Sequence, residues 1–371
     1  MAGHKTSFVF REASAGEDEA LRRLWRETPM AGSIALAFER EPSVFLAASL
    51  MGDLHQTLVA LDEHGHARAS ASRAELSAYV NGVPELLGYL SELRVHPSAR
   101  QQRRLLLDGW AHLRELHRRA GVQLYVTTIF ADNQLARRML ERNRPGWPVY
   151  LPRERLATLA ALPRLVAAPL PQGIMVRQAL PSDRAGLLEC LARNHARYQF
   201  APVWTEATLT GHPRSRGLDF SDFTIALRDQ RVVGVLAIWD QQAFKQTIVH
   251  GYHGAMTALR HVWNMTTALS HWPRLPAPGQ ALSHAYLSHL AVDDDAAPVF
   301  LALCRHALSR RRPFEYLTFT LSERHPLLAV AEAAFRHLRY DSILYAVHLG
   351  DGAREVARLD TRPAYLEAAI L

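Results

Sequence analysis

The sequence predicts an α/β protein of the α+β class, built from two similar domains in tandem, each with a mixed, largely antiparallel sheet flanked by helices. Three observations lead to this prediction. The chain has 371 residues, which is enough for two hydrophobic cores. Strand-like alternation and helix-like spacing of apolar residues succeed each other along it. The same order of patterns recurs after a Pro- and Ala-rich stretch, so we divide the chain into residues 1–161, a linker at 162–173, and residues 174–371.

The clearest internal match relates GYLSELRVHPS at residues 88–98 to AYLSHLAVDDD at residues 285–295. Both read xYLSxLxV, and a helical pattern follows each of them. The strand patterns YVTTIF and YLTFTL come next in both copies, at residues 125–130 and 316–321. Matches that keep the same order along a chain indicate a repeated structural unit.

Turn-forming and helix-capping residues indicate where the other helices and strands begin and end. In the first domain we expect strands at residues 8–12, 56–62, 66–80, 89–95, 123–130 and 147–151, helices at 14–25, 100–119 and 134–142, and a helical or mixed segment at 34–50. In the second we expect a strand-turn-helix unit at 175–191, a hairpin at 223–239, and helices at 299–310 and 327–337. Asn81-Gly82 and Asp229-Gln230 are the predicted hairpin turns.

Composition narrows the class of protein. The net charge is +7, but the arginines are spread through helices without forming a tail or an aromatic-interleaved stripe, so we expect anionic small molecules and no nucleic acid. No apolar stretch suits a membrane span or a secretory signal, which predicts a cytoplasmic protein that does not bind membranes. Cys190 and Cys304 lie in apolar helical patterns, as small buried side chains do. The histidines show no metal-ligand spacing, and we predict no metal.

The stretch at residues 88–105 is a strand that runs directly into the basic start of a helix. A helix N-terminus has free N–H groups and about half a positive charge, which favours a phosphate. Arginine side chains add forked contacts to phosphate oxygens. Arg100, Arg103 and Arg104 occupy suitable positions, so the stretch predicts a phosphate site.

This order of elements, with LRVHPSAR at residues 93–100 and NQLA at 133–136, resembles the GCN5-related N-acetyltransferase (GNAT) superfamily, in a tandem form with a degenerate second copy. The resemblance implies a splayed sheet in which the pantetheine arm of acetyl-CoA, or another acyl-CoA, enters the gap. The implied cofactor-binding residues are Leu93, Arg94, Val95, Arg100, Gln101, Gln102, Arg103, Arg104, Leu105 and Asn133. Asn133 matches a family position that contacts pantetheine or orders the catalytic acid, and capping of the next helix is the alternative.

The sequence departs from the family pattern at the phosphate loop. Arg103 and Leu105 occupy its two glycine positions, so the site either relies on arginine side chains or is silent. In the second copy, residues 293–295 are aspartates that would repel a pyrophosphate, and we interpret them as helix caps. We therefore expect the first copy to hold CoA.

Acyl transfer to an amine requires a deprotonated amine, because a free amine is mostly protonated at neutral pH. Glu92 is the candidate base, since the resemblance places an acidic residue there, and an ion pair with Arg94 is the alternative. His289 is its counterpart in the second copy. Leu140 replaces the family's usual tyrosine acid. Tyr79, Tyr125, Tyr150 or solvent would supply that proton.

The resemblance implies an acceptor pocket built by residues 29–33 and 38–41, with Tyr79. Glu39 and Glu41 either attract a cationic amine or are solvated helix charges. The predicted function is N-acyl transfer, with acetyl as the expected group and a small-molecule or peptide amine as acceptor. The alternatives are a longer acyl or acyl-carrier-protein donor, or a non-catalytic CoA-binding or regulatory module. The sequence carries no signal for oligomeric state.

Overall fold

The computed structural model describes residues 8–30, 32–165, 171–270, 273–310 and 314–371. The strands are β1 (Val9–Glu12), β2 (Ile34–Glu39), β3 (Leu54–Leu61), β4 (Ala67–Val80), β5 (Val83–Val95), β6 (Tyr125–Phe130), β7 (Val149–Leu165), β8 (Met175–Gln178), β9 (Phe223–Arg228), β10 (Arg231–Trp239), β11 (Gln246–Tyr252), β12 (His284–Val292), β13 (Tyr316–Ser322) and β14 (Phe335–His348). The helices are α1 (Asp18–Glu27), α2 (Val44–Ala48), α3 (Arg103–Arg118), α4 (Gln134–Leu140), α5 (Arg184–His195), α6 (Glu206–Leu209), α7 (Ala255–Ser270), α8 (Ala297–Ser309), α9 (Leu327–Ala334) and α10 (Ala353–Ala357).

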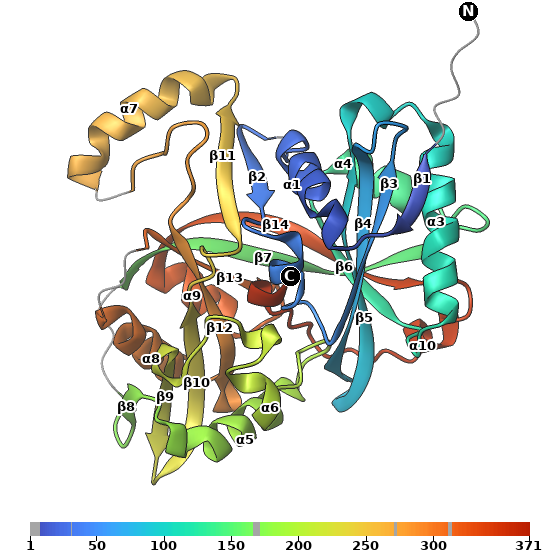
Figure 1. Cartoon of the computed structure of the whole chain (residues 1–371). Helices are drawn as coiled ribbons and strands as arrows, with labels where there is room; N and C mark the ends of the chain where they lie inside the picture. Colours follow the sequence, from blue (N-terminus) through green and yellow to red (C-terminus); the bar gives the residue numbers. More distant parts are fainter. Residues whose placement is uncertain (1–7, 31, 166–170, 271–272, 311–313) are drawn as a thin grey trace, which may run out of the picture.

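A single large sheet runs through both halves of the chain (Figure 1). Its twelve described strands lie in the order β1-β3-β4-β5-β6-β14-β7-β13-β12-β10-β9-β8. The two halves, residues 8–165 and 171–371, exchange their last strands in this order. β14 of the C-terminal half pairs with β6, and β7 of the N-terminal half pairs with β13. β7 and β14 also pair antiparallel with each other, and this pairing joins the halves.

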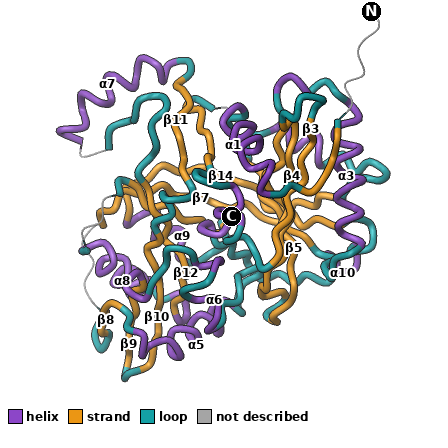
Figure 2. Tube along the Cα trace, in the orientation of Figure 1, coloured by secondary structure: helices purple, strands orange, loops and turns teal. Residues whose placement is uncertain are grey.

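Helices cover both faces of the sheet, which lies in the middle of the molecule (Figure 2). In the N-terminal half, α3 and α4 pack on one face, where Trp110 and Leu140 meet β6 and Leu58 of β3. The next residue, Val59, packs against α1 and α2 on the opposite face, as alternation along a strand requires. A further cluster combines residues of both halves, including Leu87, Val126 and Trp239. β2 and β11 form a separate two-stranded ribbon beside α7.

The internal repeat is visible in the backbone as two matching β-bulges. In β5, Glu92 and Leu93 together lie opposite the single residue Ala71 of β4. In β12, His289 and Leu290 lie opposite one residue of β10 in the same way. The first bulge residue is left-handed in both copies, with φ of 52° at Glu92 and 53° at His289. The sequence match of residues 88–98 to 285–295 therefore aligns residues with the same structural role.

Several expected boundaries differ from the structure. Residues 34–50 contain a strand, β2, before the short helix α2. The helix expected from residue 100 begins at Arg103, after a turn at Pro97–Ala99. The helix expected at 327–337 ends at Ala334, and β14 begins at Phe335. β7 continues to Leu165, so it includes the first four residues of the expected linker; residues 166–170 of that linker lie outside the described residues.

Cys190 and Cys304 are free and buried, as predicted. Among the described helices, none combines the length and apolar character needed to cross a bilayer.

Gly88 lies where β5 and β6 are closest. A Cβ atom at this position would lie 2.1 Å from the ring of Tyr125 in β6, well inside van der Waals contact. Gly88 also donates its amide proton to Leu124 O over 3.0 Å. The absence of a side chain is therefore a packing requirement of the pairing between β5 and β6.

We expect Gly88→Ala to lower the free energy of unfolding by about 3 kcal/mol, because the buried tyrosine has no room to move without disturbing the core. Chemical denaturation monitored by circular dichroism measures this loss. Gly121→Ala is the control, since its Cβ would lie 3.9 Å from Leu86 in ordinary contact. Equal stability of the two variants would contradict the proposed close contact.

Candidate functional site

The candidate site is the gap that opens where β5 leaves β6. The two strands are parallel and pair only at Gly88 with Tyr125 and Tyr89 with Val126. Beyond this contact β5 continues through its bulge to Val95. Among the described residues, no side chain accepts a hydrogen bond from the main-chain amides of Glu92 or Leu93. In this respect the bulge differs from the matching bulge of the C-terminal half, described below.

Leucines on β5, α3 and α4 are exposed. Leu93 of β5 is 38% exposed, Leu107 of α3 is 49% exposed and Leu135 of α4 is 78% exposed. Leu107 lies one turn before Trp110, whose ring packs against Trp147 in the segment after α4. It is therefore on the side of α3 that faces α4. Apolar side chains left in contact with water around one cleft are typical of a ligand site.

The start of α3 is arranged as an anion site. Its N-cap, Gln102, makes no side-chain hydrogen bond to the helix, so the first amides of the helix lack a side-chain partner. Arg100, Gln101 and Arg104 are exposed beside them. The side chain of Arg103 lies outside the described residues. Leu105 is buried against Ala60 and Ala69, and its amide donates to Gln102 O at 3.0 Å, so neither its side chain nor its amide is free for a ligand.

Asn133 caps α4. Its Oδ1 accepts a hydrogen bond from the amide of Ala136 at 3.2 Å, and this confirms the helix-capping interpretation. The assignment of Asn133 as a cofactor contact stays a prediction, because the capping residue is exposed at the rim of the same gap.

The equivalent position in the C-terminal half is closed by the protein itself. β12 and β13 part after Tyr286 and Thr318, as β5 and β6 do after Tyr89. The amide of His289 there donates to Glu367 Oε2 at 2.7 Å, and the amide of Leu290 donates to the hydroxyl of Tyr365 at 3.3 Å. Side chains of Tyr365 and Glu367 therefore bind bulge amides whose counterparts in the N-terminal half have no side-chain acceptor among the described residues.

The three aspartates that follow β12 are not helix caps, which corrects that interpretation. α8 begins after Ala296 and has no side-chain cap. Arg193 and Asn194 of α5 bind Asp293 at 2.8–2.9 Å. Asp295 pairs with Arg197 and accepts a hydrogen bond from Tyr198. These carboxylates tie α5 and the residues after it to the turn.

Glu92 is a buried, ion-paired carboxylate. Arg40 donates to its Oε1 at 3.3 Å, and Arg94 donates to its Oε2 at 3.2 and 3.3 Å. Both guanidinium groups lie over the ring of Trp25. Burial alone would raise the pKa of Glu92, but Arg94 and Arg40 outweigh it and hold the pKa below its ordinary value. The pairing with Arg94 is confirmed, and a carboxylate held in this way is a weak base.

Arg94 and Val95 belong to the same strand end. The Arg94 side chain turns toward α1, where Nη1 donates to Thr28 O at 2.9 Å, so its charge serves Glu92 and α1. Val95 packs with Leu105 and Ala99 under the start of α3. Their roles in cofactor binding stay predictions that rest on the strand's main chain.

The C-terminal half contributes residues near Glu92 that the sequence did not indicate. Lys245 Nζ is buried, donates to Ala369 O and Leu371 O at 3.1 and 2.7 Å, and lies 5.1 Å from the ring centre of Tyr286. Burial and the nearby Arg40 hold the pKa of Lys245 well below its ordinary value. Lys245 is one of only two lysines in the chain, a rarity that could have drawn attention to it.

The tyrosines proposed as acids are all core residues. Tyr125 is hydrogen bonded to His117 at 3.0 Å, Tyr150 packs against Trp110, and Tyr79 lies in a cluster with residues of the C-terminal half. A general acid has to reach its substrate, so these positions do not favour that role. Tyr340 is more open, since it is 41% exposed and packs on Phe130 at the end of β6.

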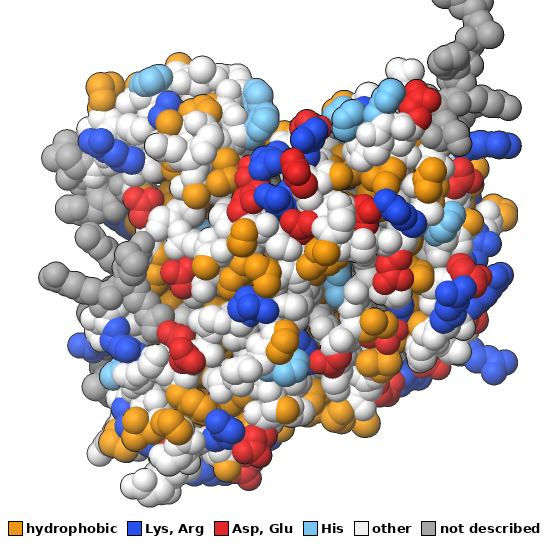
Figure 3. Space-filling model, viewed as in Figure 1, with side chains coloured by type: hydrophobic (Ala, Val, Ile, Leu, Met, Phe, Trp, Pro, Cys, Tyr) orange, Lys and Arg blue, Asp and Glu red, His pale blue; other side chains and the backbone are white. Residues whose placement is uncertain are grey.

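The expected acceptor segment carries mutually compensating charges. Arg22 and Arg26 of α1 hold the Glu41 carboxylate at 2.5 and 2.9 Å, within a mixed cluster of acidic and basic side chains on the surface near α1 (Figure 3). Glu39 lies at the end of β2, and burial raises its pKa. Ala31, within the predicted loop at 29–33, lies outside the described residues. Among the described side chains, no group of three or more metal-ligating residues is present.

Solved structures of similar architecture cover nearly the whole chain. A GCN5-related N-acetyltransferase from Sphaerobacter thermophilus matches 98% of both chains, with a TM-score of 0.54 and 14% identity. The N-myristoyltransferase of Saccharomyces cerevisiae, with bound myristoyl-CoA, matches 92% of this chain and 83% of its own, with a TM-score of 0.56 and 12% identity. The GCN5-related glucosamine N-acetyltransferase region of a fungal multi-domain enzyme matches 94% of this chain and 39% of its own, with a TM-score of 0.59 and 12% identity.

Sequence comparison matches the chain to no protein-family model and to no curated protein. The structural likeness shows the fold. The chain has the GNAT fold, and the sequence resemblance in residues 93–100 and 133–136 pointed to the correct architecture.

We expect Glu92→Gln to lower the free energy of unfolding by about 3 kcal/mol at neutral pH, because it leaves two buried guanidinium groups without their counter-ion. The lowered pKa means that the carboxylate contributes stability above about pH 4.5, and that this contribution is lost as the pH falls through the lowered value. Denaturation curves of wild type and variant should therefore converge as the pH falls from about 4.5 through the lowered pKa. A constant difference at all pH values would contradict the ion-pair assignment.

The double variant Arg40→Gln/Glu92→Gln separates stability from catalysis. It restores the charge balance and should recover part of the stability. If Glu92 is the base, turnover stays lost in this variant while CoA binding persists; full turnover in both variants would remove Glu92 from the chemistry.

Proposed function

We propose that the protein transfers an acyl group, with acetyl as the simplest candidate, from acyl-CoA to an amine, and that the donor binds in the gap between β5 and β6. The observation that carries this proposal is the contrast between the two halves. Both have the same parting strands and the same bulge. Among the described residues, side chains of the protein bind the bulge amides only in the C-terminal copy, and arginines lie at the following helix start in the N-terminal copy.

The chemistry of the gap suits a nucleotide thioester. The main-chain edge of β5 would pair with the amides of the pantetheine arm, as a neighbouring strand would. The amides at the start of α3, with Arg100 and Arg104, would hold the pyrophosphate. Named relatives in fold include N-acetyltransferases and an N-myristoyltransferase that holds myristoyl-CoA, and this supports an acyl-CoA donor.

The acceptor would approach from the α1 side of the sheet, where Glu92, Lys245 and Tyr286 lie. We propose a small-molecule or peptide amine, with residues 29–33 and 38–41 beside its path. Glu92, or water held by it, would take the proton from the amine, and Tyr340, which packs on Phe130 at the end of β6, would protonate the leaving thiolate. No metal is required for this transfer, and a cytoplasmic location is consistent with it.

A non-catalytic CoA-binding module is the second candidate. The observation that favours it is the pairing of Glu92 with two arginines, which weakens the proposed base. An assay for thiol release from acetyl-CoA over a panel of amines distinguishes the two. Release that depends on both amine and protein supports the enzyme, and binding without release supports the module.

We expect the double variant Arg100→Glu/Arg104→Glu to weaken acetyl-CoA binding at least tenfold, because two attractive charges at the pyrophosphate become repulsive. Isothermal titration calorimetry measures the change. Asp294→Arg, at the matching turn of the C-terminal half, is the control and should leave the affinity unchanged. Absence of binding to wild type at millimolar acetyl-CoA would overturn the proposal, and a changed affinity in Asp294→Arg would contradict the closed second gap.

A further inference from the structure

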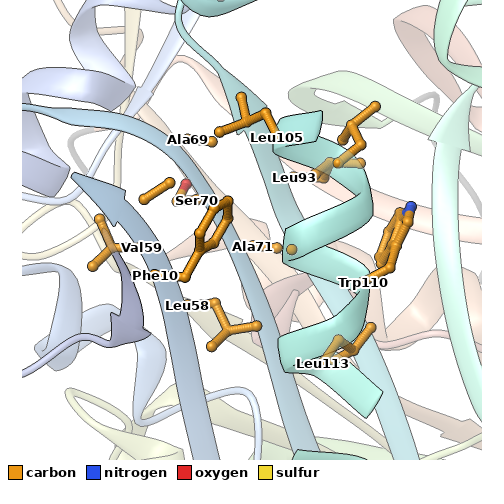
Figure 4. A pocket seen from close by; sticks show the side chains of 13 residues that line it. Phe10, Leu58, Val59, Ala69, Ser70, Ala71, Leu93, Leu105, Trp110 and Leu113 are labelled. Carbon is orange, nitrogen blue, oxygen red and sulfur yellow. The ribbon is translucent and has the colours of Figure 1, made fainter. Parts of the chain in front are cut away.

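An apolar hollow lies between α3 and the outer strands of the N-terminal half (Figure 4). Side chains from β1, β3, β4, β5 and α3 surround it, with Phe10, Leu58, Leu93 and Leu113 among them. The space itself measures about 40 Å³, and it reaches about 420 Å³ only when the open mouth and the solvent in it are included. None of the residues that line it is charged, so the hollow offers nothing to an ionic ligand.

The single hydroxyl in the lining is already engaged. Ser70 Oγ accepts a hydrogen bond from Trp25 Nε1 at 3.3 Å and donates one to Glu92 O at 3.1 Å. The other lining side chains are aliphatic or aromatic, or absent at glycine. Trp110 Nε1 is the other polar side-chain atom of the lining, and in the part of the chain that the structure describes it is buried without a hydrogen-bond partner. A ligand here would gain chiefly from leaving water. The chemistry therefore selects an alkyl chain.

Small residues keep the hollow empty. Ala60, Ala69 and Ala71 line it from the sheet, and Gly109 lines it from α3. A Cβ at Gly109 would meet Phe10 at 3.7 Å, an ordinary contact, so packing alone does not require glycine at this position. Glycine within a helix also costs about 1 kcal/mol relative to alanine. An open apolar space maintained in this way, in an otherwise close-packed core, is suited to an occupant.

The hollow shares residues with the elements of the proposed donor site. Leu93, which lines it, is the second residue of the β5 bulge, whose amides face the gap. Leu105 and Leu106, which also line it, belong to the first turn of α3 next to the proposed phosphate site. A chain attached to a thioester at the bulge can pass over Leu93 and enter the space under α3.

We propose that the hollow under α3 binds the alkyl chain of a medium-length acyl-CoA, so that the preferred donor is longer than acetyl-CoA. This inference rests on the proposed function, because it places the thioester in the gap between β5 and β6. It assigns Leu93, Leu106 and Gly109 to recognition of the donor.

The test is a titration of the full chain with CoA, acetyl-CoA, butyryl-CoA, hexanoyl-CoA and octanoyl-CoA by calorimetry. Each fully buried methylene should tighten binding about fourfold until the hollow is filled. We expect at least a tenfold gain from acetyl-CoA to hexanoyl-CoA. If acetyl-CoA binds and the longer donors bind no more tightly, the hollow is a packing void and this inference fails, while the proposed function stands. If no CoA ester binds, both fail.

Gly109→Leu fills the hollow and should abolish the gain with chain length. Ala111→Leu places the same side chain on the exposed side of the same helix and should retain the gain. Ala71→Val, on a strand that accepts a β-branched residue, provides a second way to fill the space if Gly109→Leu is unstable. An undiminished gain in folded Gly109→Leu or Ala71→Val would overturn the assignment.

Discussion

β5 and β6 remain neighbours for only two residue pairs, and the site of the N-terminal half depends on this short contact. Gly88 permits it, because the ring of Tyr125 fills the place of a side chain. After Tyr89 the bulge at Glu92 redirects β5, while β14 holds β6 on its other side. The strands therefore part along a defined line. A gap made in this way carries main-chain donors on a rigid edge, which a loop could not hold as accurately.

The C-terminal half shows that this backbone alone does not make a ligand site. Its bulge repeats the geometry of Glu92 at His289, but Glu367 and Tyr365 bind the amides that a ligand would use. Burial raises the pKa of Glu367 to about 7, and its hydrogen bonds to main-chain amides oppose that shift. In the next turn, Asp293 is bound by Arg193 of α5 and Asp295 by Arg197, which follows α5. Side chains that bind the bulge amides, and aspartates in place of arginines at the turn, both disfavour a phosphate ligand in the C-terminal half. The two halves therefore differ in their side chains while sharing the backbone.

Local patterns accounted for much of the fold. The hairpin turns at Asn81 and Asp229 were predicted from turn-forming residues and confirmed by their positive φ angles. The repeat aligned Glu92 with His289 correctly, because both copies keep xYLSxLxV. The exchange of β7 and β14 had no local signal, since each strand would read the same beside either partner. For the same reason, the ion pairs of Asp293 with α5 were mistaken for capping, which is the commonest local role of aspartate there.

The candidate site, too, could be predicted only in part from residues that are neighbours in the sequence. The start of α3 follows from a strand that runs into a basic helix, and the residues after β5 were identified on that basis. The environment of Glu92 was not accessible from the sequence, because Arg40 follows β2 and Lys245 precedes β11, far away in the chain. Whether a carboxylate is a base or a counter-ion depends on such neighbours, which only the folded chain brings together.

The C-terminal half supports the candidate site of the N-terminal half. Without β14, β6 would be an exposed sheet edge beside the gap, and its pairing with β5 is too short to fix its position. Lys245 and Tyr286 also form part of the wall around Glu92, and the segment that closes the second gap supplies the main-chain oxygens that hold Lys245. The C-terminal segment therefore contributes to both halves. It closes the gap beside β12, and it holds Lys245 next to the candidate site of the N-terminal half.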